Sequence, residues 1–429
     1  MRLLAAPGMA AYYVAATLAR VGDEMVGFAL VLLVLDRTGS PLFAGAAGAA
    51  YALPAIATGP LLGAWLDRTA YRRTALGVNQ AVLGLTMLGM LAVVGRAPDA
   101  IALLLAAVAG LTLPMVSGGF TSMLPSLVPA PLLTRANAAE AASFSAATMA
   151  GPAAAATVAA LFSPAAAVGL IVVTAASSIL ALVAVPVVAP VVAGDGPSML
   201  AAALDGLRHL VRVPPLRSAT VASTLSLGAN GLLLVALPLH MGTLGAPRAA
   251  GGYVWTAIEV GSVATALLVG RRQERWRPER TVVLSVAAFG VGVATWPLAG
   301  SLGALIALAF LAGLLEGPMM PALFGARQQY SPLALQGRVS TTAASLRMGA
   351  LAVGQAAGGL LVPHTGTAAV LLIVGGTQVG AALLGLLAVR SRQAVPGAGA
   401  MASASWGRGM SSEAPSATAS TTSPASTPP

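Results

Sequence analysis

Cysteine, histidine and charged side chains are scarce in this sequence of 429 residues. Because there is no cysteine, a disulfide framework, a thiolate metal site and a cysteine nucleophile are excluded. The three histidines, His209, His240 and His364, are far apart, so we expect neither a metal site nor a cofactor. Only 8% of the residues are charged, against roughly 25% in soluble domains. Most of the surface must therefore face lipid.

Apolar runs occupy nearly the whole chain, with 57% hydrophobic residues and a mean hydropathy of +0.86. Runs of about 20 apolar residues are long enough to cross a bilayer as helices, and breaks of Gly, Pro and charge separate twelve of them. The first six spans are predicted at 11–35, 42–66, 74–95, 100–124, 137–161 and 165–190. The second six are predicted at 217–241, 249–270, 281–299, 301–324, 339–362 and 367–389.

These spans divide the chain into four parts. Residues 1–190 form an N-terminal six-helix half, 191–216 a central cytoplasmic linker, and 217–390 a C-terminal six-helix half. Residues 391–429 are rich in Ala, Ser, Thr and Pro, a composition that predicts a disordered cytoplasmic tail. The first apolar run lacks a convincing cleavage signal, so we interpret it as a membrane helix and not as a signal peptide.

The basic residues are all arginines and lie mostly in the short breaks between spans. With both termini inside, 18 arginines fall in cytoplasmic segments, three (Arg37, Arg96, Arg248) in external ones and two within helices. This positive-inside bias accounts for the net charge of +10 without nucleic-acid binding. It predicts a multi-pass protein of the cell membrane with both termini in the cytoplasm.

The loop after the second span carries a charged motif, Gly63-Ala-Trp-Leu-Asp67-Arg68-Thr-Ala-Tyr-Arg72-Arg73. It resembles the G-x-x-x-D-R-x-G-R-R signature of the major facilitator superfamily, with Ala70 and Tyr71 where the family usually places glycine and a basic residue. The resemblance implies an all-α membrane protein with twelve transmembrane helices in two pseudo-symmetric six-helix bundles. A carboxylate and guanidinium groups at helix ends can bridge two helices in one transport state and release them in another. A plain positive-inside loop is the alternative.

Two loop patterns recur in the second half. Gly270, Glu274 and Arg275 repeat the spacing of the first motif at an offset of 207 residues. Independently, a proline six residues before an arginine occurs at Pro129 and Arg135 and again, at an offset of 203, at Pro332 and Arg338. The repetition favours an internal duplication, in which two halves rock around a central site.

Several further segments resemble the drug:proton antiporter branch of the superfamily, which contains macrolide-type and siderophore exporters. They are Arg20-Val-Gly-Asp23, Thr38-Gly39-Ser40-Pro41, Leu124-Pro125-Ser126-Leu127-Val128-Pro129 with Arg135-Ala136-Asn137, and Gly337-Arg338-Val339. The resemblance extends over residues 9–390 and implies efflux.

The fifth span contains Ala147-Thr-Met-Ala-Gly151-Pro152-Ala-Ala-Ala155, which resembles the antiporter signature G-x-x-x-G-P-x-x-G with alanine at the two outer glycine positions. Small residues let helices approach closely, and a proline removes a backbone hydrogen bond, so Gly151 and Pro152 fit a gating helix. The alternative is compositional, because glycine and alanine are abundant throughout the chain.

Carboxylates inside the spans are costly in lipid and are candidates for proton coupling. Glu259 and Glu316 each stand alone in an apolar run, where a desolvated carboxyl group can bind a proton reversibly. Asp23 shares a helix face with Arg20, so a structural pair and proton carriage are both open. Glu24 points to a different face, which could meet lipid headgroups, another helix or the cavity. A neutral, hydrogen-bonded packing role is the alternative for Glu259 and Glu316.

The remaining polar residues within the spans are candidates for contact with charge or substrate. Arg347 could neutralise a carboxylate, contact an anionic substrate or snorkel to the membrane surface. Asn230, Gln355 and Gln378 could line the cavity.

Together these patterns predict a monomeric secondary transporter, not an enzyme. It would exchange protons for small amphipathic molecules, since no ATP-binding G-x-x-x-x-G-K-[ST] motif occurs. An importer or facilitator of the same fold is one alternative, and a membrane-embedded enzyme or non-transporting sensor is the other.

Overall fold

A computed structural model describes residues 8–69, 71–186, 199–273 and 275–390, and these residues form helices without any β-strand. The predicted tail, 391–429, lies outside the described residues. The helices of the first half are α1 (Met9–Thr38), α2 (Pro41–Ala52), α3 (Ala55–Arg68), α4 (Arg72–Val93), α5 (Asp99–Gly110), α6 (Phe120–Leu127), α7 (Leu133–Leu161) and α8 (Pro164–Val183). They are followed by α9 (Met199–Arg212), α10 (Pro214–His240), α11 (Gly251–Gln273), α12 (Pro278–Ala294), α13 (Leu302–Glu316), α14 (Met319–Tyr330), α15 (Leu333–Thr365) and α16 (Thr367–Arg390).

All twelve predicted membrane crossings correspond to helical segments. Within the described residues, ten stretches are long and apolar enough to cross a membrane. The other two crossings are the first and the fourth in chain order. The first is α1, a 30-residue helix that carries three charged residues near its middle. The fourth is the segment from α5 to α6, which is helical but interrupted.

Three crossings predicted as continuous helices are broken, and each break lies at a proline. The second crossing is split into α2 and α3 next to Pro54, and the tenth into α13 and α14 at Pro318. In the fourth, Pro114 precedes a five-residue π-helix, Met115–Gly119, that joins α5 to α6. Proline lacks the N–H that an uninterrupted helix would donate at that position.

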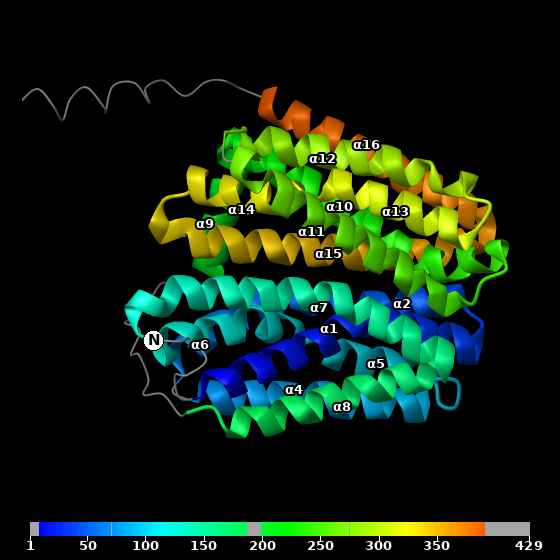
Figure 1. The fold of residues 1–429 in the computed structure, drawn as a ribbon, viewed down its shortest axis with the longest axis horizontal. Helices are drawn as coiled ribbons and strands as arrows, with labels where there is room; N and C mark the ends of the chain where they lie inside the picture. The colour runs from blue at the N-terminus through cyan, green and yellow to red at the C-terminus, as the bar shows by residue number, and fades with distance from the viewer. Residues whose placement is uncertain (1–7, 70, 187–198, 274, 391–429) are drawn as a thin grey trace, which may run out of the picture. The chain divides into compact units, whose positions relative to one another are not determined.

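The helices gather into two groups that follow the chain order (Figure 1). The elements α1 to α8 form one group and α9 to α16 the other. Each group has its own buried apolar clusters, which contain Phe28 and Met87 in the first and Phe289 and Trp296 in the second. The described residues therefore form two packed bundles, one from each half of the chain.

The predicted linker contains a helix, α9, that was not expected from the sequence. The helix α9 packs mainly on α15 and α10 and also contacts α3, so it touches both groups. We call the helix ends near α9, where α3 ends and α4 begins, the linker side. The opposite ends, which include the turn between α1 and α2, are the far side.

Candidate functional site

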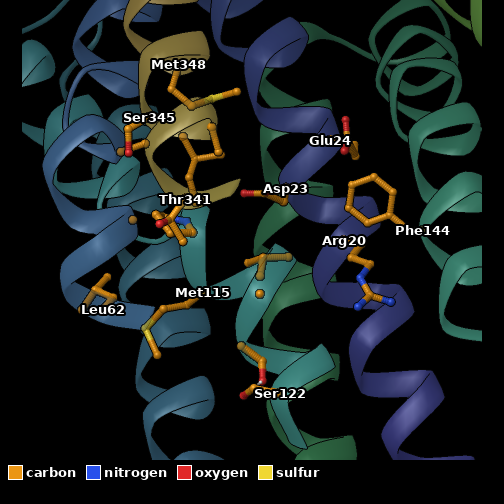
Figure 2. Close-up of a pocket in the computed structure, with 18 residues that line it drawn as sticks. Arg20, Asp23, Glu24, Leu62, Met115, Ser122, Phe144, Thr341, Ser345 and Met348 are labelled. Atoms are coloured by element: carbon orange, nitrogen blue, oxygen red, sulfur yellow. Dashed lines mark hydrogen bonds between the residues drawn. The ribbon is translucent and has the colours of Figure 1, made fainter. Parts of the chain in front are cut away.

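A cavity of about 460 Å³ lies between the two groups of helices. Its walls come from α1, α3, the segment from Leu113 to Ser122, α7 and α15. Most of the lining is apolar, with Leu62, Met115, Phe144 and Met348 among the larger side chains (Figure 2). Because α15 belongs to the second group and the other walls to the first, movement between the groups must change this cavity.

Two neighbouring carboxylates from the middle of α1 line the cavity, Asp23 and Glu24. Asp23 accepts a hydrogen bond of 3.1 Å from the Tyr51 hydroxyl. Figure 2 shows Asp23 pointing towards the side of Thr341 and Glu24 lying on the side of Phe144. Asp23 was predicted as a candidate from the sequence, whereas the surroundings of Glu24 stayed open, because an apolar run does not indicate which side of its helix faces a cavity.

Arg20 does not pair with Asp23 on its own helix. Its guanidinium forms a buried ion pair with Glu140 of α7 and donates a 3.2 Å hydrogen bond to the Ser143 hydroxyl. Glu140 also accepts hydrogen bonds from the hydroxyls of Tyr12 (3.0 Å) and Thr121 (3.1 Å). Multiple donors offset the cost of burying a carboxylate. Among the residues that the structure describes, Asp23 forms no ion pair, and Arg20 is engaged by Glu140.

Glu259 and Glu316, the strongest sequence candidates for proton coupling, do not line the cavity. Both are partly buried, Glu259 in α11 and Glu316 at the end of α13. The charge of Glu259 interacts with the charges of both Glu24 and Glu316. Glu316 in turn interacts with the charge of Arg347 on α15. These pairwise interactions link α1, through α11 and α13, to Arg347 on α15, and of the four residues only Glu24 lines the cavity.

The candidate amide side chains, Asn230, Gln355 and Gln378, make packing contacts between helices and do not line the cavity. The Asn230 side-chain oxygen accepts a 3.1 Å hydrogen bond from Gln378, which links α10 to α16 within the second group. Gln355 is 1% exposed and lies against α2, where a Cβ added at Gly48 would come within 2.8 Å of its amide. None of the three is among the residues that line this cavity.

Gly151 and Pro152, from the antiporter-like segment, lie at contacts of α7 with other helices. A Cβ at Gly151 would come within 2.6 Å of the Glu24 Cβ, so only glycine permits this approach of α7 to α1. The carbonyl of Pro152 is equally close to a Cβ built at Gly252 of α11. This stretch of α7 therefore contacts α1 of its own group and α11 of the other group. It packs directly against Glu24, one of the cavity carboxylates.

The arginines of the first motif loop donate hydrogen bonds to main-chain carbonyls of neighbouring segments. Arg72 donates a 3.3 Å hydrogen bond to the carbonyl of Ser122 in α6, and Arg73 a 2.8 Å bond to that of Val185, after α8. The second contact places a guanidinium group at the carboxyl end of α8, which is the negative end of that helix. The other motif residues, Gly63, Asp67 and Arg68, lie in the last turns of α3, and their side chains lie outside the described part of the structure.

The second motif loop follows α11, as its repeat position predicts. Gly270 lies in the last turn of α11, Arg275 is exposed after the helix ends, and Glu274 lies outside the described residues. The other repeated pair, Pro129–Arg135 and Pro332–Arg338, stands at the starts of α7 and α15. The repeats thus mark equivalent positions in the two groups.

Contacts between the two groups close the far side. Arg248 donates a 3.0 Å hydrogen bond to the carbonyl of Leu35, and the hydroxyls of Thr157 and Tyr253 lie 3.0 Å apart. On the other flank, α2 and α15 meet so closely that a Cβ at Gly45 would lie 2.4 Å from the carbonyl of Gln355. The cavity residues all lie on the linker side of these contacts.

Two helical groups with a cavity between them, closed at one end by contacts between the groups, are an arrangement typical of membrane transporters. The family model of the Major Facilitator Superfamily matches residues 12–229 and again residues 219–422. The chain belongs to the major facilitator superfamily, and the two successive matches agree with the duplicated halves.

Similar proteins carry the same fold. A Sinorhizobium fredii (strain NBRC 101917 / NGR234) protein described as an uncharacterized MFS-type transporter, y4rN, is 30% identical over 388 residues, which cover 88% of this chain and 94% of that protein. A mutant of the nucleoside transporter NupG has a TM-score of 0.70 at 12% identity, covering 88% of this chain and 99% of its own. A mutant of the peptide transporter POT has a TM-score of 0.70 at 15% identity, covering 90% and 94%.

Proposed function

We propose that this transporter is a proton-coupled exporter of small amphipathic organic compounds, such as drugs or secondary metabolites. The observation that carries the proposal is the pair of carboxylates, Asp23 and Glu24, in the wall of a mainly apolar cavity of about 460 Å³. Pockets for small organic ligands commonly measure roughly 300–1,000 Å³ and combine apolar walls with a few polar groups. The apolar lining suits the hydrocarbon part of a substrate, and the carboxylates suit its polar part or a proton.

The proton would bind to these carboxylates. A carboxyl group at an apolar cavity wall favours the protonated form, and one open to water releases the proton. Alternating access moves Asp23 and Glu24 between two such environments. Glu24 also interacts with the charge of Glu259, so that a proton bound on α1 alters the charge balance at α11 and onward to Glu316.

Helix α7 supplies a route from proton binding to movement. Gly151 packs on the backbone and Cβ of Glu24, while the neighbouring Pro152 packs on α11 across the group interface. A shift of α1 on protonation would therefore displace the α7–α11 contact on the far side. The likeness of this segment to the antiporter signature supports exchange over simple facilitation.

The direction, outward from the cell, rests on the branch resemblance and on the arginine distribution. With the linker side in the cytoplasm, the cavity described above is accessible to compounds from inside the cell. The protein would then act as a monomer in the cell membrane, with both termini in the cytoplasm.

The test is transport in inverted membrane vesicles, using a fluorescent amphipathic dye and an imposed pH gradient. Asp23→Asn and Glu24→Gln are expected to lose gradient-driven accumulation while dye exchange at equal pH continues, because substrate binding remains. Glu259→Gln and Glu316→Gln are expected to lose gradient-driven efflux as well. Asp99→Asn, an exposed carboxylate on the far side, is the matched control and should transport normally.

The same assay separates the alternatives. Accumulation in inverted vesicles means export in the cell, whereas accumulation only in right-side-out vesicles would establish the importer. Full gradient-driven transport by both cavity variants would show that the proton binds elsewhere.

A further inference from the structure

Helix α9 carries a row of apolar side chains that no other part of the described structure covers. Leu204 is 52% exposed, Leu207 39% and Val211 52%. Their spacing of three and four residues places them on one face of the helix. Three adjacent exposed aliphatic side chains on a helix of 14 residues form a contiguous apolar patch and call for an apolar environment.

Two exposed arginines, Arg208 and Arg212, flank this row. They lie one turn apart, on the same edge of the apolar face. The nearby carboxylate of Asp205 is engaged by Arg338 of α15 at 3.1 Å. The edge therefore presents positive charge directly beside the apolar row.

The opposite face of α9 fixes the helix to the second group. A Cβ at Gly206 would come within 2.6 Å of the Arg338 carbonyl, and Leu210 is 2% exposed. The His209 ring lies 3.0 Å from the carbonyl of Tyr330. The apolar row thus faces away from α15 and cannot be buried by simple rotation of α9.

The position of α9 along the chain places it at the membrane surface. Its last residue, Arg212, is followed within two residues by Pro214, the start of a membrane-crossing stretch. At that level the helix borders the lipid headgroups. Amphipathic helices with arginines beside an apolar face lie in this zone, with the apolar side chains at the boundary between headgroups and acyl chains.

We propose that α9 is a lipid-binding element that lies on an anionic bilayer surface, with Leu204, Leu207 and Val211 at the acyl boundary and Arg208 and Arg212 on phospholipid phosphates. The inference is independent of the proposed export activity. It has a mechanical consequence, because α9 contacts α3 and α15, which both line the cavity. Anionic lipid would hold α9 in the surface and so influence the separation of these two walls.

The test uses the absence of cysteine from the chain, which permits single labels on an otherwise unchanged protein. Leu204→Cys is labelled with a polarity-sensitive nitrobenzoxadiazole dye and reconstituted in phosphatidylcholine, with and without phosphatidylglycerol. We expect a blue-shifted emission that is quenched by spin-labelled lipid and strengthened by phosphatidylglycerol. Tyr71→Cys, 73% exposed in the α3–α4 loop, is the matched control and should report water.

The contribution of charge is tested by adding Arg208→Gln and Arg212→Gln to the labelled protein. Each arginine at an anionic surface contributes about a five-fold change in binding, so the double variant should need up to roughly 30-fold more phosphatidylglycerol for the same response. The matched control is Arg272→Gln with Arg280→Gln, two exposed arginines remote from α9 in sequence, which should leave the response unchanged.

Three results would overturn the proposal. The label at residue 204 could report water in every lipid mixture, as at residue 71. It could be shielded but not quenched by lipid nitroxides, which would mean that protein covers α9. Finally, the response to phosphatidylglycerol could survive loss of both arginines.

Discussion

Glu140→Gln removes the carboxylate that neutralises Arg20 while keeping an oxygen that can accept from Tyr12 and Thr121. The Arg20 and Glu140 side chains are only 2% and 7% exposed. Losing one partner of such a pair leaves the other charge buried and costs about 3–5 kcal/mol of folding free energy. The pair between Asp205 and Arg338 is a natural comparison, because its side chains are 43% and 30% exposed.

The expected difference between the two pairs is large enough to measure. Asp205→Asn should cost at most about 1 kcal/mol, the usual worth of a solvent-exposed pair. The double variant Arg20→Met with Glu140→Gln should recover much of the loss of Glu140→Gln, since no uncompensated charge remains. The free energy of unfolding can be obtained for all variants by titration with sodium dodecyl sulfate in mixed micelles, followed by tryptophan fluorescence. The reasoning is refuted if Glu140→Gln costs no more than Asp205→Asn. It is also refuted if the double variant costs as much as the sum of Glu140→Gln and Arg20→Met measured singly.

Two glycine substitutions test the close contacts of α7 and α11, with Gly169→Leu as control because a Cβ at Gly169 meets nothing within 4 Å. Gly151→Leu should lower the free energy of unfolding by about 1–3 kcal/mol, since its side chain would overlap Glu24 in a packed contact; stability equal to that of the control would contradict the contact. Gly252→Leu should open the far side, seen as faster labelling by an impermeant maleimide of a Leu239→Cys reporter, which packs on apolar clusters of both groups; an unchanged rate would mean that this contact does not seal it.

The membrane crossings were predictable because burial in lipid imposes a length and composition that apolar runs reveal directly. The breaks at Pro54, Pro114 and Pro318 were less so, since proline is tolerated inside membrane helices and does not always end them. Helix α9 was missed because it is short, amphipathic and surrounded by linker composition. The helical spacing of its apolar residues can be recognised only after the flanking membrane spans have been assigned.

The charged site was predictable in kind but not in pairing. A charged side chain is costly to place in lipid. This cost makes functional candidates of Arg20, Asp23, Glu259 and Glu316, whatever residues surround them. Spacing along one helix suggested Asp23 as the partner of Arg20, whereas the fold supplies Glu140 from 120 residues away. A contact between α1 and α7 depends on how the helices rotate and pack, which a single sequence does not encode in any local pattern.

The hydrogen bonds that Arg248 and Thr256 make across the far side end on main-chain carbonyls, those of Leu35 and Met149. Every residue type has this acceptor, so the first half can exchange the side chains at 35 and 149 without losing either bond. The second half has no such freedom, because the donors are particular side chains. These two bonds are thus specified by the second half alone, whereas the contact of Thr157 with Tyr253 needs a hydroxyl from each half. A hybrid that joins the first half of a relative to the second half of this chain should therefore retain both main-chain bonds.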